Sequence, residues 1–158
     1  MPADPERLRS FVDESALGLG KALERAREDV VYAGHPLVPE VSLGTEDTAW
    51  MPAVSALGLV VVIRDKRIRT RPAELDVFRA AGLRAFGLAS KRDLSTWDYL
   101  VRVVRHWDAI ETLVAERVAG PWFMAIGERD VTDVALAPLG MAGRGRGRSS
   151  YQARRVSE

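Results

Sequence analysis

The sequence has no cysteine among its 158 residues, and this absence excludes several chemistries at once. Disulfide bonds, cysteine-ligated zinc, iron–sulfur clusters and thiol nucleophiles all require that residue. Histidine is nearly as scarce, because only His35 and His106 occur. Two histidines cannot build a multi-histidine metal site within one chain, and His35, in a loop rich in proline and glycine, has no evident partner. The chemistry of this protein must therefore be sought in other side chains.

Long apolar runs and targeting signals are also missing. The longest apolar stretch, residues 56–63, has the length of a strand and is well short of the roughly 18–20 residues that a membrane-spanning helix needs. The amino-terminal residues have neither the basic start nor the apolar stretch of a signal peptide. We therefore expect a cytoplasmic protein that does not associate with a membrane.

Charge is distributed unevenly along the chain. The last 19 residues hold five arginines and one glutamate, whereas the rest of the chain holds 18 basic and 21 acidic residues. The length and the 47% hydrophobic content suffice for one folded core. We therefore expect a single domain over residues 1–139 and a basic, disordered tail over residues 140–158. Arg-Gly runs such as the one in this tail can bind nucleic acid.

Strand and helix patterns alternate along the chain. The segments with the length and composition of strands are residues 8–12, 30–32, 59–63, 83–88 and 122–126. The segments with helical spacing or helix-start signals are residues 15–28, 45–56, 72–81 and 94–118, the last being one long helix or two in sequence. This alternation predicts an α/β domain with a mainly parallel sheet. In the last helical segment we expect Trp97 to pack in the core.

Acidic side chains follow two of the expected strands. Asp13 and Glu14 come directly after the first strand, and Asp65 comes after the third. The carboxyl ends of parallel strands meet at one edge of a sheet, so Asp13 and Asp65 converge if their strands are neighbours. Clustered carboxylates repel one another, so they either become protonated or need a cation, for which Mg²⁺ or Mn²⁺ is the natural choice. Each acid also has an ordinary structural interpretation, as a turn or helix-cap residue.

Basic side chains gather beside these acids. Between the third strand and the next helix lie Lys66, Arg67, Arg69 and Arg71, and Lys91 follows the fourth strand at the same expected edge. Such cations can hold RNA phosphates. The alternative interpretation is a solvated loop whose charges balance the nearby acids.

Three strings resemble the PIN-like nuclease domain. They are FVDES at residues 11–15, TEDTAWMP at residues 45–52, and VVIRDKRI at residues 61–68 with RPAE at residues 71–74. More narrowly, they look like the small branch grouped with VapC-type toxins of type II toxin–antitoxin systems. The resemblance covers roughly residues 8–126. It implies a three-layer α/β/α domain with a mainly parallel central sheet of four to five strands, and the activity of a metal-dependent endoribonuclease.

The resemblance also implies a ligand set and partners. Asp13, Asp47 and Asp65 match the metal-binding and catalytic acids of the family, with Mg²⁺ or Mn²⁺ as cofactor. The glutamate that the family adds between the first two acids has no clear counterpart, and the candidates for an additional ligand are Glu14, Glu40 and Glu46. The implied partners are an RNA substrate, a cognate antitoxin protein and a second copy of the chain.

Two other interpretations remain open. A receiver-like signalling module also places an acidic pair after its first strand and a phosphoacceptor, here Asp65, after its third. That fold requires a lysine after the fifth strand, however, whereas Lys91 follows the fourth. The second alternative is a catalytically weak PIN-like domain that only binds RNA or a partner.

Overall fold

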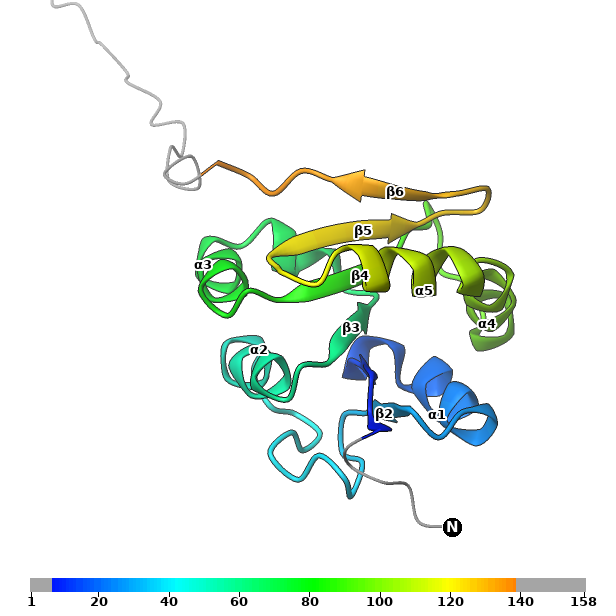
Figure 1. The fold of residues 1–158 in the computed structure, drawn as a ribbon, viewed down its shortest axis with the longest axis horizontal. Coiled ribbons are helices and arrows are strands. Elements are labelled where there is room, and N and C mark those ends of the chain that lie inside the picture. The colour runs from blue at the N-terminus through cyan, green and yellow to red at the C-terminus, as the bar shows by residue number, and fades with distance from the viewer. Residues whose placement is uncertain (1–6, 139–158) are drawn as a thin grey trace, which may run out of the picture.

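A computed structural model of the chain describes residues 7–138 and contains one six-stranded sheet (Figure 1). The strands are β1 (Ser10–Val12), β2 (Val30–Tyr32), β3 (Val60–Ile63), β4 (Arg84–Leu88), β5 (Trp122–Ile126) and β6 (Val131–Val134). They lie in the order β2-β1-β3-β4-β5-β6. The first five are parallel, and β6 runs antiparallel to β5. The expected tail over residues 140–158 lies outside the described residues.

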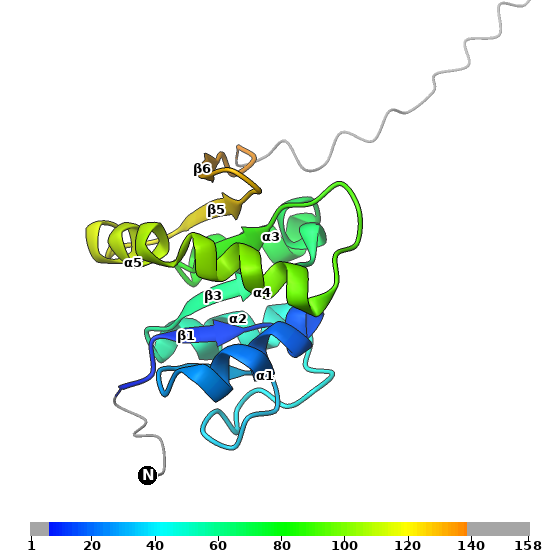
Figure 2. The same cartoon turned by 90° about the vertical axis from the view of Figure 1, so that its right-hand side faces the viewer.

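Helices cover both faces of the sheet. The α-helices are α1 (Leu17–Ala26), α2 (Asp47–Ala56), α3 (Pro72–Ala80), α4 (Thr96–Arg105) and α5 (Trp107–Glu116). Short 3-10 turns, η2 (Glu14–Ala16) and η3 (Lys66–Arg69), follow β1 and β3. Helices α2 and α3 lie on one face, and α1, α4 and α5 lie on the other, as the two views show (Figures 1 and 2). The three-layer α/β/α class is therefore confirmed. None of the helices within residues 7–138 combines the length and apolarity needed to cross a membrane.

The central strand β3 shows why two covered faces follow from the sequence. Successive strand side chains point to opposite faces. Accordingly, Val61 and Ile63 pack in the cluster formed with α2 and α3, whereas Val60 and Val62 pack in the cluster formed with α1, α4 and α5. All four residues are buried. A strand buried on both faces must be apolar at every position, which is the pattern of residues 59–63.

The sheet has one more strand than the four to five expected. Strand β6 extends the sheet beyond β5, and its four residues are exposed or half-buried. A turn joins the two strands, in which the amide of Gly127 donates to the carbonyl of Asp130 at 2.8 Å. The sequence Val-Thr-Asp-Val has only weak apolar alternation, because an edge strand buries little. That weak pattern is why residues 131–134 were not expected to form a strand.

The helical segment over residues 94–118 divides at His106 into α4 and α5. The expectation that Trp97 packs in the core is wrong, because this side chain is 68% exposed. Helix α4 instead buries Tyr99 and Val103, which lie on a different face of the helix. Helical spacing shows which residues share a face, but the packing of the helix decides which face meets the sheet.

Candidate functional site

Strands β1 and β3 are neighbours, so the acids that follow them reach the same edge of the sheet. Val12 is paired with Val62 in the parallel register. One residue further on, the amide of Asp13 donates to the carbonyl of Val62 at 2.9 Å. The turn after β1 is therefore fastened to β3 just before Asp65. The adjacency of the first and third strands, which the sequence left open, is thus present in the structure.

Asp13 is the buried acid of this edge, with only 6% of its surface exposed. Its Oδ2 accepts a hydrogen bond from the amide of Ser15 at 3.0 Å, which caps η2. Burial raises the pKa of Asp13 above its ordinary value, and the charge of Asp47 raises it further, while hydrogen bonds from Ser15 partly oppose this shift. Asp13 is thus a carboxylate whose negative charge would be relieved by a nearby cation.

Ser15 has a role that the sequence interpretation missed. The helical segment expected over residues 15–28 begins with η2, and Asp13 provides the cap of this turn. The Ser15 hydroxyl accepts hydrogen bonds from the amides of Arg64 at 3.0 Å and Asp65 at 3.3 Å. It therefore joins the turn after β1 to the turn after β3. The sequence feature that could have indicated this role is the position of the Ser15 hydroxyl, two residues after the strand-end acid Asp13.

Asp47 is the first residue of α2, and its Oδ1 accepts a hydrogen bond from the indole of Trp50 at 2.9 Å. Asp65 caps η3, where its Oδ1 accepts from the amide of Arg67 at 2.9 Å. The Arg67 guanidinium also contacts the Asp65 carboxylate, with Nη2 2.6 Å from Oδ2. This contact lowers the pKa of Asp65 below its ordinary value. The charge of Asp47 also acts on Arg67, whose guanidinium thus lies within electrostatic range of two candidate ligands.

The expected acids are not gathered into a ready-made metal centre. Within residues 7–138, no group of three or more His, Cys, Asp or Glu side chains is placed to hold a metal ion. The chemistry of the donors does fit a hard cation, since the charge of Asp47 helps raise the pKa of Asp13 and both side chains offer only oxygen atoms. Asp65 is engaged by Arg67 instead.

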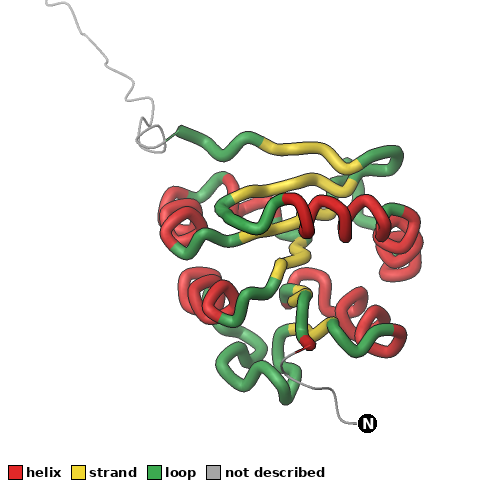
Figure 3. The backbone as a smooth tube through the Cα atoms, in the orientation of Figure 1, coloured by secondary structure: helices red, strands yellow, loops and turns green. Residues whose placement is uncertain are grey.

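The three glutamates considered as further ligands have other surroundings. Glu14 accepts a hydrogen bond from the amide of Gly44 at 2.8 Å. Glu46 is the exposed residue before α2, and its side chain makes no capping hydrogen bond. Glu40 is exposed in the loop over residues 33–46, which joins β2 to α2 (Figure 3). Within residues 7–138, none of these three carboxylates completes a metal-binding group with Asp13.

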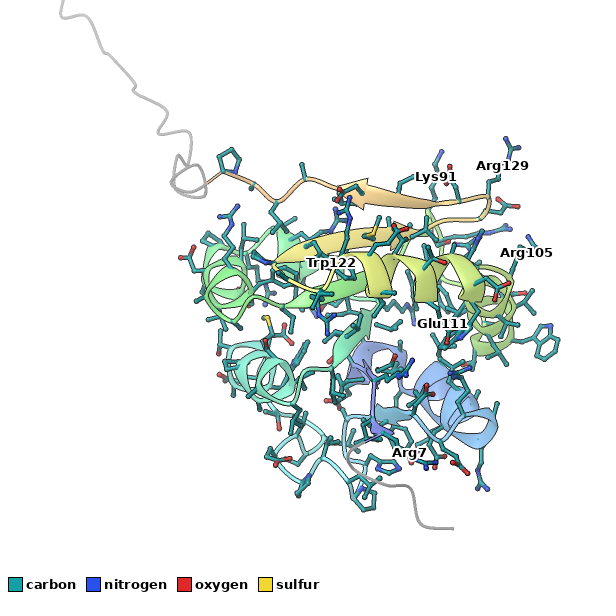
Figure 4. All side chains as sticks on the ribbon, viewed as in Figure 1. Arg7, Lys91, Arg105, Glu111, Trp122 and Arg129 are labelled. Atoms are coloured by element: carbon teal, nitrogen blue, oxygen red, sulfur yellow. The ribbon has the colours of Figure 1, made fainter. Side chains whose placement is uncertain are left out.

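A basic cavity of about 580 Å³ opens beside Asp65. Its lining includes Ser15 and four cationic side chains, which are Arg64, Arg67, Lys91 and Arg92. Lys91 lies at the end of the sheet towards which β5 runs (Figure 4). Arg64 pairs with Asp93, and its guanidinium lies 5.4 Å from the centre of the Tyr99 ring. Arg64 was not among the expected phosphate-binding residues, although it directly follows β3.

Arg69 lines a smaller neighbouring cavity of about 150 Å³, together with Asp65. Its guanidinium lies 4.9 Å from the centre of the Phe123 ring. The Nε atom is buried and has no hydrogen-bond partner among residues 7–138. By contrast, Arg71 pairs with Glu74 at 3.5 Å. The side chain of Lys66 lies outside the part of the structure that is described.

A family model described as a PIN like domain matches residues 8–90. The matched span runs from just before β1 to just after β4, and it contains Asp13, Asp47 and Asp65. No curated protein matches the chain, and no solved structure matches it.

Proposed function

Since the chain belongs to the PIN-like domain family, we propose that it is a divalent-metal-dependent nuclease that hydrolyses RNA phosphodiesters. The reaction site is the carboxyl edge of the sheet, between Asp13 and the basic cavity beside Asp65. The observation that carries the proposal is the buried Asp13 carboxylate, whose charge is disfavoured by burial and by Asp47. A cation at this edge would remove that cost.

We assign the metal ligands to Asp13, Asp47 and Asp65, which provide the hard oxygen donors that Mg²⁺ and Mn²⁺ prefer. A bound ion of this kind supplies an activated water and stabilises the leaving oxygen of a phosphodiester. Ser15 acts as a positioning residue, because its hydroxyl accepts from the backbone amide of Asp65 and so orients the turn that carries this carboxylate.

The cations beside Asp65 hold the RNA backbone in this proposal. The proposed phosphate-binding residues are Lys66, Arg67, Arg69, Arg71 and Lys91. Arg69 is the best supported of them, because it lines a cavity next to Asp65 and its buried Nε has no partner among residues 7–138. A phosphate oxygen would supply the missing acceptor.

Cleavage of a mixed cellular RNA preparation tests the activity. The purified full-length protein is incubated with Mg²⁺, with Mn²⁺ or with EDTA. We expect discrete fragments that require a metal. In Asp13→Asn and in Asp65→Asn, cleavage should fall to the EDTA background while the circular dichroism spectrum is retained.

The matched control is Asp76→Asn, which removes a carboxylate from an exposed position on α3. It should cleave as the wild type does. Undiminished cleavage by a well-folded Asp13→Asn variant would show that the activity is a contaminant or lies elsewhere, and the assignment would be abandoned.

A PIN-like domain that binds without turnover is the second candidate. The ion pair between Arg67 and Asp65 favours it, because one proposed metal ligand already has a positive partner. Calorimetric titration separates the two candidates. Binding of Mn²⁺ at or below millimolar concentration supports the nuclease, whereas no binding at that concentration supports the second candidate.

The narrower proposal is that the protein acts as a VapC-type toxin with a cognate antitoxin, and it rests on the sequence resemblance. Induced expression in a bacterial host should then arrest growth, and Asp13→Asn should relieve the arrest. The receiver-like alternative is weaker, because β5 is followed by Gly-Glu-Arg-Asp at residues 127–130 and not by a lysine.

A further inference from the structure

A second cavity, of about 270 Å³, lies at the opposite edge of the sheet, where the strands begin. It is bounded by the start of β1, by Gly58 and Val60 around the start of β3, by Arg84 at the start of β4, and by α5. In α/β sheets of this type, ligands bind beyond the carboxyl ends of the strands. This cavity is therefore separate from the proposed nuclease site and is not explained by it.

The walls of this cavity are mainly apolar. They include Leu8, Val60, Ile110 and Val114, together with the indole of Trp107. The indole nitrogen of Trp107 is buried and has no hydrogen-bond partner within residues 7–138. Buried donors without an acceptor are rare in folded proteins and call for an explanation. The volume lies just below the roughly 300–1,000 Å³ of small-molecule sites, so the cavity suits a ligand of one or two rings.

The polar groups around the cavity favour an anion. Its two acids, Asp29 and Glu111, are both paired with Arg27, at 2.7 Å and 3.3 Å. In Figure 4, Glu111 extends from α5 towards α1, and Arg27 is the residue that directly follows α1. Arg27 offsets one of these two acidic charges, and the lining carries two further guanidinium groups, Arg9 and Arg84. Three guanidinium groups thus face two carboxylates, which leaves a net charge of +1 (3 − 2) around the cavity.

Arg84 is held in place, because its Nη2 donates to the carbonyl of Gly58 at 2.9 Å. Within residues 7–138, the Arg9 side chain makes no hydrogen bond or ion pair, and it acts on Asp29 through its charge. A larger and more open cavity of about 860 Å³ lies beside this one and shares Leu8, Arg9 and Asp29 with it.

We propose that this cavity binds a small aromatic anion, with its ring system against Trp107 and the apolar wall and its carboxylate or sulfonate against Arg9 and Arg84. The charged group would make charge-assisted hydrogen bonds to the guanidinium groups. The Arg27 guanidinium, which is not part of the lining, lies 4.6 Å from the centre of the Trp107 ring.

A matched pair of fluorescent probes tests the proposal on the full-length protein. One is 1-naphthalenesulfonate, and the other is the neutral 1-naphthalenesulfonamide, so that both carry the two rings that the cavity suits. We expect the sulfonate to bind with one-to-one stoichiometry and at least about tenfold more tightly than the neutral probe. Arg84→Gln and Arg9→Gln should each reduce this preference and leave the affinity for the neutral probe unchanged.

Two phenylalanine variants locate the site. Ala115 is an exposed lining residue of α5, and Ala115→Phe should fill the cavity and weaken binding of both probes at least about tenfold. Val118→Phe, at a 74% exposed position outside the lining, should bind as the wild type does. The proposal is wrong if Ala115→Phe binds normally, if both probes bind equally, or if Trp97→Ala removes binding, since the probe would then lie on α4.

Discussion

At the scale of single residues, Asp13 has a carboxylate that the fold makes costly to ionise. The cost comes first from burial and then from the charge of Asp47, and the amide of Ser15 offsets only part of it. A neutral carboxyl group at this position would therefore stabilise the folded chain more than an ionised one. This property is measurable without knowing the substrate.

We predict that Asp13→Asn changes the pH dependence of stability. The pKa of Asp13 is raised in the folded state above its ordinary value of 3.8, so the folded protein holds this proton more tightly than the unfolded chain does. Wild-type stability relative to Asp13→Asn should therefore be greatest below pH 3.8. It should fall as the pH rises from 3.8 through the folded-state pKa. Urea unfolding in EDTA over this range measures the difference.

Asparagine retains an oxygen that can accept from the amide of Ser15, so the cap of η2 is kept in this variant. Asp76→Asn controls for the loss of one carboxylate. A difference between wild type and Asp13→Asn that stays constant across the pH range would show that burial of Asp13 carries no electrostatic cost.

We predict that Arg67→Gln increases the affinity for Mn²⁺. The guanidinium and the metal compete for the carboxylate of Asp65, so removing the guanidinium frees a ligand. The ion pair is exposed, so a rise in affinity of about two- to fivefold is expected. Calorimetric titration measures it. Arg71→Gln, which breaks the neighbouring pair with Glu74, is the control, and an equal rise there would point to general electrostatics only.

At the scale of secondary-structure elements, the approach of α1 to the sheet depends on a glycine. A Cβ atom at Gly20 would lie 2.8 Å from the Cβ of Tyr32 and 3.0 Å from the Cβ of Val12. Both neighbours are held in strands, so neither can move without moving the backbone. Helix α1 can therefore pack closely against β1 and β2 only because Gly20 has no side chain.

We predict that Gly20→Ala destabilises the protein. Glycine to alanine within a helix ordinarily stabilises by about 0.5–1 kcal/mol, but overpacking costs about 1–3 kcal/mol, and here the second effect should win. Chemical unfolding measures the change. Lys21→Ala, an exposed neighbour on α1, should change stability by less than about 0.5 kcal/mol. A Gly20→Ala variant more stable than the wild type would mean that α1 is free to shift outward.

Helix α4 presents an apolar stripe to solvent, formed by Trp97, Val101 and Val104. We predict that Trp97→Ala changes the free energy of unfolding by less than about 0.5 kcal/mol, because the side chain buries little surface. Tyr99→Ala removes a buried ring from the same helix and should cost about 3 kcal/mol or more. Thermal and chemical unfolding compare the two, and equal losses would contradict the packing of α4.

At the scale of the whole molecule, the local distribution of charge matters more for RNA binding than the net charge does. The formal net charge is only +1, yet the cavity beside Asp65 is lined by Arg64, Arg67, Lys91 and Arg92. A nearly neutral protein can still bind RNA if its cations converge on one edge. The measurable consequence is the salt dependence of binding.

We predict that Lys91→Gln reduces the slope of log affinity against log salt concentration by about 0.7 for single-stranded RNA, the amount expected for one lost phosphate contact. Fluorescence anisotropy in EDTA, where cleavage is absent, measures the slope. Lys21→Gln on α1 removes the same charge from outside this cavity and should leave the slope unchanged. Equal slopes for Lys91→Gln and the wild type would remove Lys91 from the RNA-binding surface.

The sequence by itself determined the alternation of strands and helices, because the spacing of apolar residues within each element is a local property of consecutive residues. It also determined that Asp13 and Asp65 follow strands, so their presence at one sheet edge required only that β1 and β3 be neighbours. The family strings around these acids are likewise local, and the match over residues 8–90 agrees with them.

Tertiary structure alone decided the relations between distant segments. The hydrogen bonds from Arg64 and Asp65 to the Ser15 hydroxyl span about fifty positions, and no local pattern encodes them. The exposure of Trp97 depends on how α4 rotates against the sheet, and the cavity against α5 depends on the packing of four elements. Periodicity describes one element at a time, whereas burial, pKa shifts and cavities are properties of elements packed together.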